Sequence, residues 1–329
     1  MNYNHELGSK LPQNHMNLHL DSSPNDIWKL FYPDTQQPEP ISDSRNYSNA
    51  RECFLFNSIF INHISRSAIY YTNHNMFKFL YSDCLFSRCS STTHAGVIFI
   101  SGSGSAVQYR SCCYKSVMKD ETKGDESGHH SYIKLESLNY KSYIFDCSFY
   151  ECGNIQNSNT NCLLYGDIEV KSINTSFCKA KFSSGVFNSY KQNHCRILTS
   201  SFCNTTSSEA ILKINILNFS FCNVLNNELQ ANSVVFFVTT SAFIENCSIL
   251  FNNGTVFNSD SISIHVINTF CDNMETYKNI QTENVQKLYS INSLNHFASN
   301  ICEAYNYQEN RINKKETAPF IQYKFSIRR

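Results

Sequence analysis

One segment carries the residue types best suited to catalysis. Asp167, Glu169 and Lys171 alternate with two aliphatic residues, and alternate residues of a β-strand lie on the same face. Two carboxylates and an amine on one face could bind calcium or attack a glycosidic bond. They could equally form the solvated outer face of a strand. We favour the solvated face and expect no catalytic residue, because the neighbouring segments add only Lys134, Glu136, Asn188 and Lys213.

The 15 cysteines are a second source of chemistry. Cys178, Cys203 and Cys222 each follow a phenylalanine, and Cys271 repeats that position. If a repeat stacks them, they form one column, most simply a ladder of small apolar side chains. Neighbouring strands lie about 4.8 Å apart, within the roughly 4.4–6.8 Å Cα range of a disulfide, so an oxidising compartment could cross-link the column. The odd cysteine count and the absence of a signal peptide favour reduced thiols.

Metal binding has less support. The Cys-x-x-x-x-Cys pairs at 84–89 and 147–152 have a loose zinc spacing. They lie two repeats apart, about 9.6 Å, which is too far to share an ion with bonds of about 2.3 Å. His129 and His130 offer two imidazoles in a predicted loop with no third ligand in sight. We therefore expect no metal and no cofactor.

These residues belong to a repeat of about 26 residues with two landmarks. The second landmark is a small or polar residue before two apolar ones, as at 96–98 and 210–212, in segments rich in Val, Ile and Phe. The repeat predicts an all-β, single-domain, right-handed parallel β-helix of about nine coils over residues 51–275, its handedness taken from parallel β crossovers in general. The first landmark is an apolar residue among Ser, Asn and Cys, expected to form a ladder that includes Phe86, Phe149, Phe177, Phe202, Phe221 and Phe270, with Cys113 in the same place.

The two halves of the repeat differ in length variation. The distance from the second landmark to the next first landmark is nearly constant at about 15–18 residues, whereas the return distance varies from about 6 to about 18. One side of the coil therefore carries the loops. The longest excursion, 115–130, is charged and contains glycine, which predicts a projecting loop. We also expect a set of asparagines past the first landmarks to make turns and a hydrogen-bonded ladder: Asn223, Asn226, Asn252, Asn253 and Asn273.

The two ends of the chain depart from the repeat. Residues 1–50 are polar, and within them Ser23 and Pro24 precede an apolar run containing Trp28. This predicts a capped short helix that covers the first coil. Residues 276–329 read as a degenerate cap or tail, in which residues 321–327 alternate apolar with polar and suggest a closing strand.

Composition limits the partners. The 27 basic and 27 acidic residues cancel, and charged residues are only 16% of the chain, against about 25% in typical domains. No basic stripe is present, so we expect no nucleic-acid partner. Because we find neither a signal peptide nor an apolar run of about 18 residues, we expect no transmembrane helix and a cytoplasmic location by default.

Three segments resemble a known family. Residues 84–89 and 147–152 read Cys-x-Phe-x-x-Cys, and residues 95–100 read Ala-Gly-Val-Ile-Phe-Ile. This style resembles the right-handed β-helix proteins expanded in trichomonad protists, which are similar to bacterial polymorphic outer-membrane proteins. The resemblance covers roughly residues 52–275 and implies a pectate-lyase-like superfold, which also hosts polysaccharide-active enzymes. Many such proteins carry a signal or membrane anchor, so it also implies the cell surface and adhesion as an alternative to the cytoplasm.

Two main functional hypotheses follow. The first is a non-enzymatic β-solenoid that binds a protein or a glycan through its loop edge, since the scaffold is regular, the loops lie on one side and no chemistry is clustered. The second is a divergent polysaccharide lyase or glycoside hydrolase whose site rests on Asp167, Glu169 and Lys171. A third is a truncated pseudogene product, or a relative of the surface family, that has no independent function.

Overall fold

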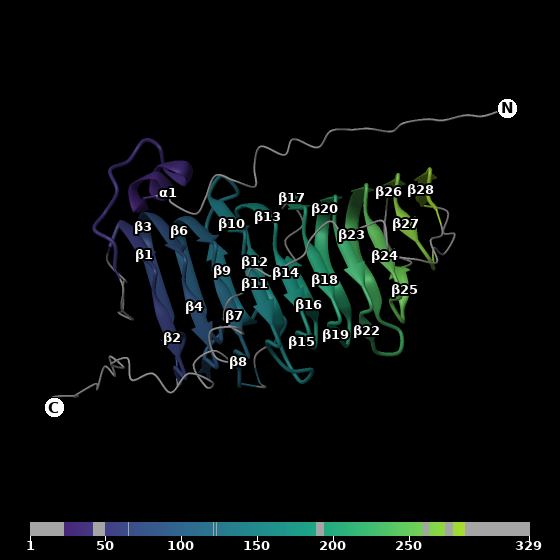
Figure 1. Cartoon of the computed structure of the whole chain (residues 1–329), viewed down its shortest axis with the longest axis horizontal. Helices are drawn as coiled ribbons and strands as arrows, with labels where there is room; N and C mark the ends of the chain where they lie inside the picture. Colours follow the sequence, from purple (N-terminus) through teal and green to yellow (C-terminus); the bar gives the residue numbers. More distant parts are fainter. Residues whose placement is uncertain are drawn as a thin grey trace, which may run out of the picture.

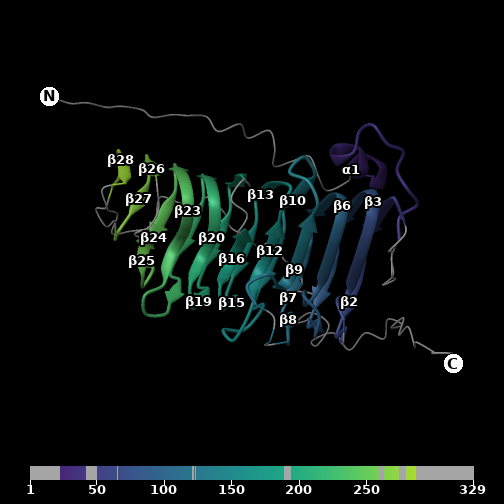
Figure 2. The same cartoon turned by 180° about the vertical axis from the view of Figure 1, so that it is seen from behind.

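The chain is a stack of coils, each coil being one turn of the backbone around a common axis. The computed structural model describes residues 23–41, 50–64, 66–120, 122, 124–188, 194–258, 263–273 and 279–286. In Figure 1 the coils follow one another in sequence order, from the purple and blue N-terminal coils to the green C-terminal ones. Figure 2 shows the same order from behind. Coils that are adjacent in sequence are therefore adjacent in space.

Four parallel sheets and one helix, α1 (Pro24–Phe31), make up this stack. The long sheet contains β1 (Glu52–Phe56), β3 (Ile69–Ser82), β6 (Ile98–Tyr109), β9 (Gly128–Leu135), β10 (Lys141–Phe145), β12 (Asn159–Leu164), β13 (Asp167–Lys171), β16 (Ser183–Asn188), β17 (His194–Leu198), β20 (Ala210–Ser220), β23 (Val234–Glu245), β25 (Thr255–Phe257), β26 (Ser263–Ile267) and β28 (Ile280–Glu283). The short sheet contains β2 (Ile59–Ile61), β4 (Leu85–Ser87), β7 (Cys112–Tyr114), β11 (Ser148–Tyr150), β14 (Asn174–Ser176), β18 (Ser201–Cys203), β21 (Asn223–Leu225), β24 (Ser248–Leu250) and β27 (Phe270–Cys271). The two small sheets contain β15 (Lys179–Ala180), β19 (Thr206–Ser207) and β22 (Glu228–Leu229), and β5 (Ser90–Ser91) and β8 (Val117–Met118).

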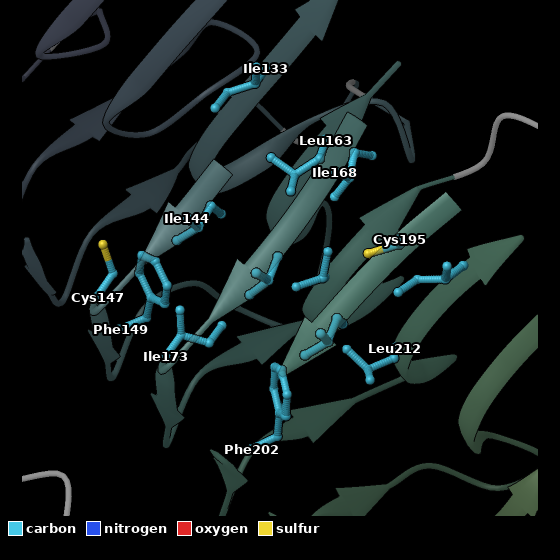
Figure 3. Close-up of a cluster of buried hydrophobic side chains, with 14 of the residues drawn as sticks. Ile133, Ile144, Cys147, Phe149, Leu163, Ile168, Ile173, Cys195, Phe202 and Leu212 are labelled. Atoms are coloured by element: carbon cyan, nitrogen blue, oxygen red, sulfur yellow. The ribbon is translucent and has the colours of Figure 1, made fainter. Parts of the chain in front are cut away.

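This arrangement confirms the predicted all-β parallel solenoid. The short sheet holds nine strands in sequence order, and the stack makes about eight turns, where about nine coils were expected. One hydrophobic cluster runs through it from Cys53 to Cys271, and Figure 3 shows aliphatic, aromatic and cysteine side chains from several strands meeting inside the stack. A single coil buries too little to offset its loss of backbone entropy, so the coils depend on their neighbours.

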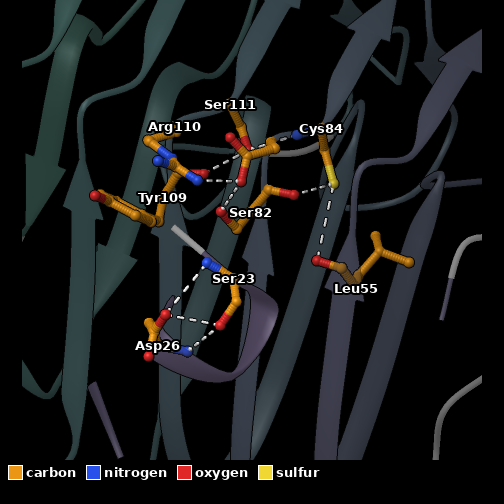
Figure 4. A network of polar contacts seen from close by, with 9 residues as sticks. Ser23, Asp26, Leu55, Ser82, Cys84, Tyr109, Arg110 and Ser111 are labelled. Carbon is orange, nitrogen blue, oxygen red and sulfur yellow. Dashed lines mark hydrogen bonds and ion pairs between the residues drawn. The ribbon is translucent and has the colours of Figure 1, made fainter. Parts of the chain in front are cut away.

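Each of the first eight strands of the short sheet lies between two residues in the left-handed backbone conformation, and β27 follows one such residue, Asn268. The second of them comes five positions after the first, so the chain turns, runs for a short strand and turns again. Contacts between neighbouring coils support these turns, as when Arg110 donates to Asp83 at 2.8 Å. Figure 4 shows a second such contact, in which the backbone nitrogen of Cys84 donates to the hydroxyl of Ser111 at 3.2 Å. The first corner column is Asn57, Asp83, Arg110, Asp146, Ser172, Thr199, Phe221, Asn246 and Asn268. The second corner column is Asn62, Arg88, Lys115, Glu151, Phe177, Asn204, Asn226 and Phe251.

The ladder of landmark phenylalanines is only partly as predicted. Phe86, Phe149 and Phe202 are buried and point into the core. Phe177 and Phe221 do not, because they are corner residues with 46% and 38% of their surface exposed. Phe270 pairs with Ser248, one position before the inward residue. The inward position of the short sheet is occupied in turn by Phe60, Phe86, Cys113, Phe149, Thr175, Phe202, Val224, Ile249 and Cys271.

The reason for the error is that this inward position accepts residues other than phenylalanine. Thr175 and Val224 occupy it in the two coils whose nearby phenylalanines, Phe177 and Phe221, lie at corners. Matching phenylalanine to phenylalanine therefore shifted the alignment of those coils by a few residues. In a β-strand a shift of one residue already exchanges the inner and outer faces.

Helix α1 forms where predicted and covers more than the first coil. Ser23 and Asp26 make a reciprocal capping box, and Pro24 occupies the first turn. Trp28 is fully buried, with its ring 5.8 Å from that of Phe54. The helix packs on the outer face of the long sheet, across four coils, through contacts with Phe54, Leu80, Val107, Tyr109, Tyr143 and Phe145. Figure 1 shows it beside β3 and β6 at the N-terminal end of the stack.

The projecting loop is shorter than the predicted range 115–130. Residues 117–118 form β8, and β9 begins at Gly128, so the loop lies between Met118 and Gly128. The prediction that His129 and His130 lie in this loop was wrong, because both are buried residues of β9. Residues 119–126 are charged, and the strand that follows them is polar although it is buried. The predicted loop was therefore too long, because it included the start of this strand.

Candidate functional site

The candidate catalytic residues lie on one face, as their alternation predicts. Strand β13 directs Asp167, Glu169 and Lys171 outward, and it buries Ile168 and Val170. Strands β10 and β17 lie in register on either side, so Tyr143 and Arg196 are the cross-strand neighbours of Glu169.

Arg196 holds both carboxylates. One of its guanidinium nitrogens lies 3.1 Å from Asp167 Oδ1 and 2.8 Å from Glu169 Oε2. Tyr143 donates a hydrogen bond of 2.7 Å to the other oxygen of Asp167, and burial together with this bond raises the pKa of Tyr143. The two carboxylates are thus satisfied by protein groups rather than directed at an open space.

The position of this group beside α1 gives it a structural role. Lys141, the cross-strand neighbour of Asp167, donates to the carbonyl oxygen of Phe31, the last residue of the helix. A cation at a helix C-terminus satisfies one of its free carbonyl groups and the helix dipole. The charged group therefore forms the polar border of the apolar patch on which α1 packs.

The other polar residues considered with Asp167 do not join it. Lys213 lies on β20 and pairs with Glu209 at 2.8 Å. Its ammonium group also lies 5.5 Å from the ring centres of Phe182, Phe187 and Phe237. Lys134 lies on β9 and Asn188 lies on β16. These strands line up with the first half of β20, whereas β13 lines up with its second half. The chain does not build a catalytic cluster from these positions.

The structure does not bring the four predicted ladder cysteines into one column. Cys178 follows the second corner column and Cys222 follows the first. Cys203 is the half-buried last residue of β18, and Cys271 lies at the inward position of β27. Each of the four follows a phenylalanine, but those phenylalanines occupy different places in the coil. The prediction of one cysteine column was wrong because the cysteines were aligned by these phenylalanines.

The cysteines instead flank the corners. Cys84, Cys147, Cys222 and Cys247 each follow the first corner residue, and Cys89, Cys152 and Cys178 follow the second. All fourteen cysteines of the described ranges are free thiols. Over the same ranges, no group of three or more His, Cys, Asp or Glu side chains is arranged to hold a metal ion.

A pocket lies at the loop edge, between the loops of two successive coils. Its volume is about 380 Å³, and no charged or aromatic side chain lines it. Gln230 and Asn232 come from the loop before β23, and Asn273 comes from the segment after β27. These three side chains make no hydrogen bond within the described part of the chain. The lining is Leu229, Gln230, Ala231, Asn232, Ser233, Asn252, Asn253, Gly254, Thr255 and Asn273.

An asparagine ladder holds Asn252, one of the residues that line this pocket. Asn227 donates 2.8 Å to the side-chain oxygen of Asn252 and 2.9 Å to the carbonyl oxygen of Phe202. Asn252 donates 2.9 Å to the carbonyl oxygen of Val224. Of the asparagines expected to make turns and a ladder, Asn226 makes a turn as a corner residue and Asn252 belongs to the ladder. Asn227 was not among the predicted asparagines. Its position could have been found from the repeat, because it comes one residue after a corner, where several other coils have cysteine.

Comparison with known proteins adds no relative. No protein-family model, no curated protein and no solved structure matches the chain. Among the helices of the described residues, none is long and apolar enough to cross a membrane. The function must therefore be argued from the geometry of the stack and of its loop edge.

Proposed function

We propose that the chain is a non-enzymatic β-solenoid that binds a neutral, hydroxyl-rich ligand, a glycan, in the pocket at its loop edge. The observation that carries this proposal is the lining of the pocket, in which seven of ten residues bear an amide or hydroxyl group and none bears a charge. A charged ligand would lose its hydration there without an opposite charge to compensate. A sugar can exchange its bonds to water for bonds to amide and hydroxyl groups.

The size of the pocket supports a small ligand rather than a protein surface. A volume of about 380 Å³ lies at the lower end of the usual range for small-molecule sites, about 300–1,000 Å³. The hydrogen bond from Asn227 fixes Asn252 in the lining, while Gln230, Asn232 and Asn273 remain free to reorient toward a ligand. With no aromatic ring to stack on a sugar, one pocket should bind weakly.

A glycan array probed with the full chain tests this proposal. We expect binding to neutral oligosaccharides that is insensitive to salt, and we expect Gln230→Ala and Asn273→Ala to reduce it. Gln156→Ala is the matched control, since Gln156 is exposed in a loop outside the pocket. Binding only to charged glycans, or equal binding by the pocket variants and the control, would contradict the proposal.

The alternative of a lyase or hydrolase has less support. A glycosidase needs one carboxyl group as an acid and the other as a base or nucleophile. Asp167 and Glu169 are both held by the same nitrogen of Arg196. We therefore expect the full chain to leave polysaccharides intact in calcium, as will its Asp167→Ala variant. Depolymerisation by the wild type that is lost in this variant would establish the enzyme instead.

The relationship to trichomonad β-helix proteins, with the cell-surface role that it implies, belongs to the same proposal. What supports it is the structural meaning of the Cys-x-Phe-x-x-Cys motif. In both copies the cysteines follow the two corner residues, and the phenylalanine fills the inward position between them. The motif thus encodes one corner, one strand and the next corner.

A further inference from the structure

We propose that Cys113 and Cys152 are a redox-active pair that closes to a disulfide between adjacent coils when the protein meets a peroxide. This inference is independent of the ligand proposed for the loop edge. It rests on the positions of two sulfur atoms in the core, and it does not use the cysteine column expected from the sequence.

The distance between the two sulfur atoms favours this pair. The Sγ atoms of Cys113 and Cys152 lie 3.5 Å apart, and both residues are fully buried. Cys113 points inward from β7, and Cys152 follows the corner after β11 in the next coil. Because they occupy different columns, the two side chains converge on one another. A disulfide is about 2.05 Å long, so closure needs a sulfur movement of about 1.5 Å.

Cysteines stacked in the same corner column also bring their thiols into contact, as Cys152 and Cys178 do, but their side-chain directions are less suited to a disulfide. Cys222 and Cys247 are such a pair, in successive coils. There the sulfur of Cys247 lies 3.5 Å from the backbone nitrogen of Cys222, which donates to it. Side chains of one column project in parallel from strands about 4.8 Å apart, so their Cβ atoms lie farther apart than the roughly 3.5–4.5 Å of a disulfide.

Within the pair, Cys152 is the nucleophile, because it contacts a third thiol, that of Cys178, as well as the thiol of Cys113. Burial raises the pKa of Cys152, but hydrogen bonds with the thiols of Cys113 and Cys178, a hydrogen bond with the backbone of Ser116 and the nearby His130 together lower it. The pKa values of Cys113 and Cys178 are raised, first by burial and then by their contact with Cys152. Negative charge within the three thiols is therefore best accommodated on Cys152, and the thiolate is the form that reacts.

The chemistry balances with hydrogen peroxide as the oxidant. The sulfur of Cys152 attacks one peroxide oxygen, which gives a sulfenic acid and releases one water after proton transfer. The sulfur of Cys113 then attacks Cys152, forms the S–S bond and releases the second water. Two thiols lose two protons and two electrons, and one peroxide becomes two waters. A small neutral oxidant suits sulfurs that only local opening exposes.

Peptide mapping of the full chain tests the pair. The reduced protein is treated with hydrogen peroxide, denatured, alkylated and digested, and linked peptides are identified by mass spectrometry. We expect a peptide pair joining Cys113 to Cys152, two fewer alkylated thiols, and reversal by dithiothreitol. Cys84→Ser is the matched control, because the Cys84 sulfur donates to the carbonyl oxygens of Leu55 and Ser82, and it should leave the link intact.

A second variant separates the nucleophile from its partner. In Cys113→Ser the sulfenic acid of Cys152 has lost its proposed partner, so dimedone should label Cys152. A link between Cys152 and Cys178 in the wild type would overturn the assignment of the partner. Full alkylation of both Cys113 and Cys152 after peroxide would overturn the proposal itself. The wild-type map decides the question even if Cys113→Ser fails to fold.

Discussion

Acid should destabilise this protein through two buried histidines before its carboxylates are protonated. His129 and His130 are adjacent in β9, and burial lowers the pKa of each from 6.5 to about 4. His129 accepts a hydrogen bond from the backbone nitrogen of Met118 at 3.3 Å and lies 3.0 Å from the carbonyl oxygen of Asn157. Protonation would remove that acceptor. His130 packs between the rings of Phe86 and Phe149.

The sign and size follow from proton linkage. Between pH 6.5 and 4 the unfolded chain binds more protons at these two sites than the folded chain, so stability is full above pH 6.5 and falls as the pH decreases. Integrating from pH 7.5 to 5 gives a loss of about 2 kcal/mol for each histidine, about 4 kcal/mol for both. That loss is a large part of a typical total of about 5–15 kcal/mol.

Urea denaturation at pH 7.5 and pH 5 measures this loss directly. We expect His130→Leu, which keeps an apolar side chain at the site, to reduce the difference between the two pH values by about 2 kcal/mol. His129→Gln should reduce it by a similar amount. His74→Gln is the control, since the side chain of His74 is 96% exposed, and it should change nothing. A pH difference that is the same in the wild type and both buried-site variants would refute the reasoning.

Three further predictions concern stability. Phe221→Asn should raise the free energy of unfolding by about 1 kcal/mol, because asparagine tolerates the left-handed conformation of this corner. The control Phe219→Asn, which buries an amide in the core, should lower the melting temperature. Trp28→Ala should cost about 3–5 kcal/mol and abolish hydrogen-exchange protection of α1, whereas exposed Leu30→Ala should not. Asn227→Ala should cost about 1–3 kcal/mol in urea denaturation, because its partners lie buried without replacement; an unchanged midpoint would contradict this.

The sequence predicts local chemistry better than the alignment of coils. The capped helix at Ser23 depends on residues adjacent in the chain, and it forms where expected. The alternation of β13 likewise places Asp167 and Glu169 outward. Both depend on backbone periodicity alone, which a short window of sequence reveals.

The sequence could not reveal contacts between residues of neighbouring coils. Arg196 lies 27 positions after Glu169 and becomes its neighbour only through the pairing of β13 with β17. The contact of Cys113 with Cys152 spans the longest variable segment of the repeat. Loop length hides such pairings, and phenylalanine is an unreliable marker of them because the inward position also accepts Thr175 and Val224.

The constant five-residue interval between the two corner columns has an evolutionary consequence. Since residues as different as Asp83, Ser172 and Phe221 serve at the first corner, the bend is specified by backbone conformation and by the coils on either side. Whole coils can then be gained or lost as units. Deleting residues 147–172 would join Asp146 to Ile173 with the next corner still in place. The number of coils can therefore change during evolution while the cross-section of the stack stays the same.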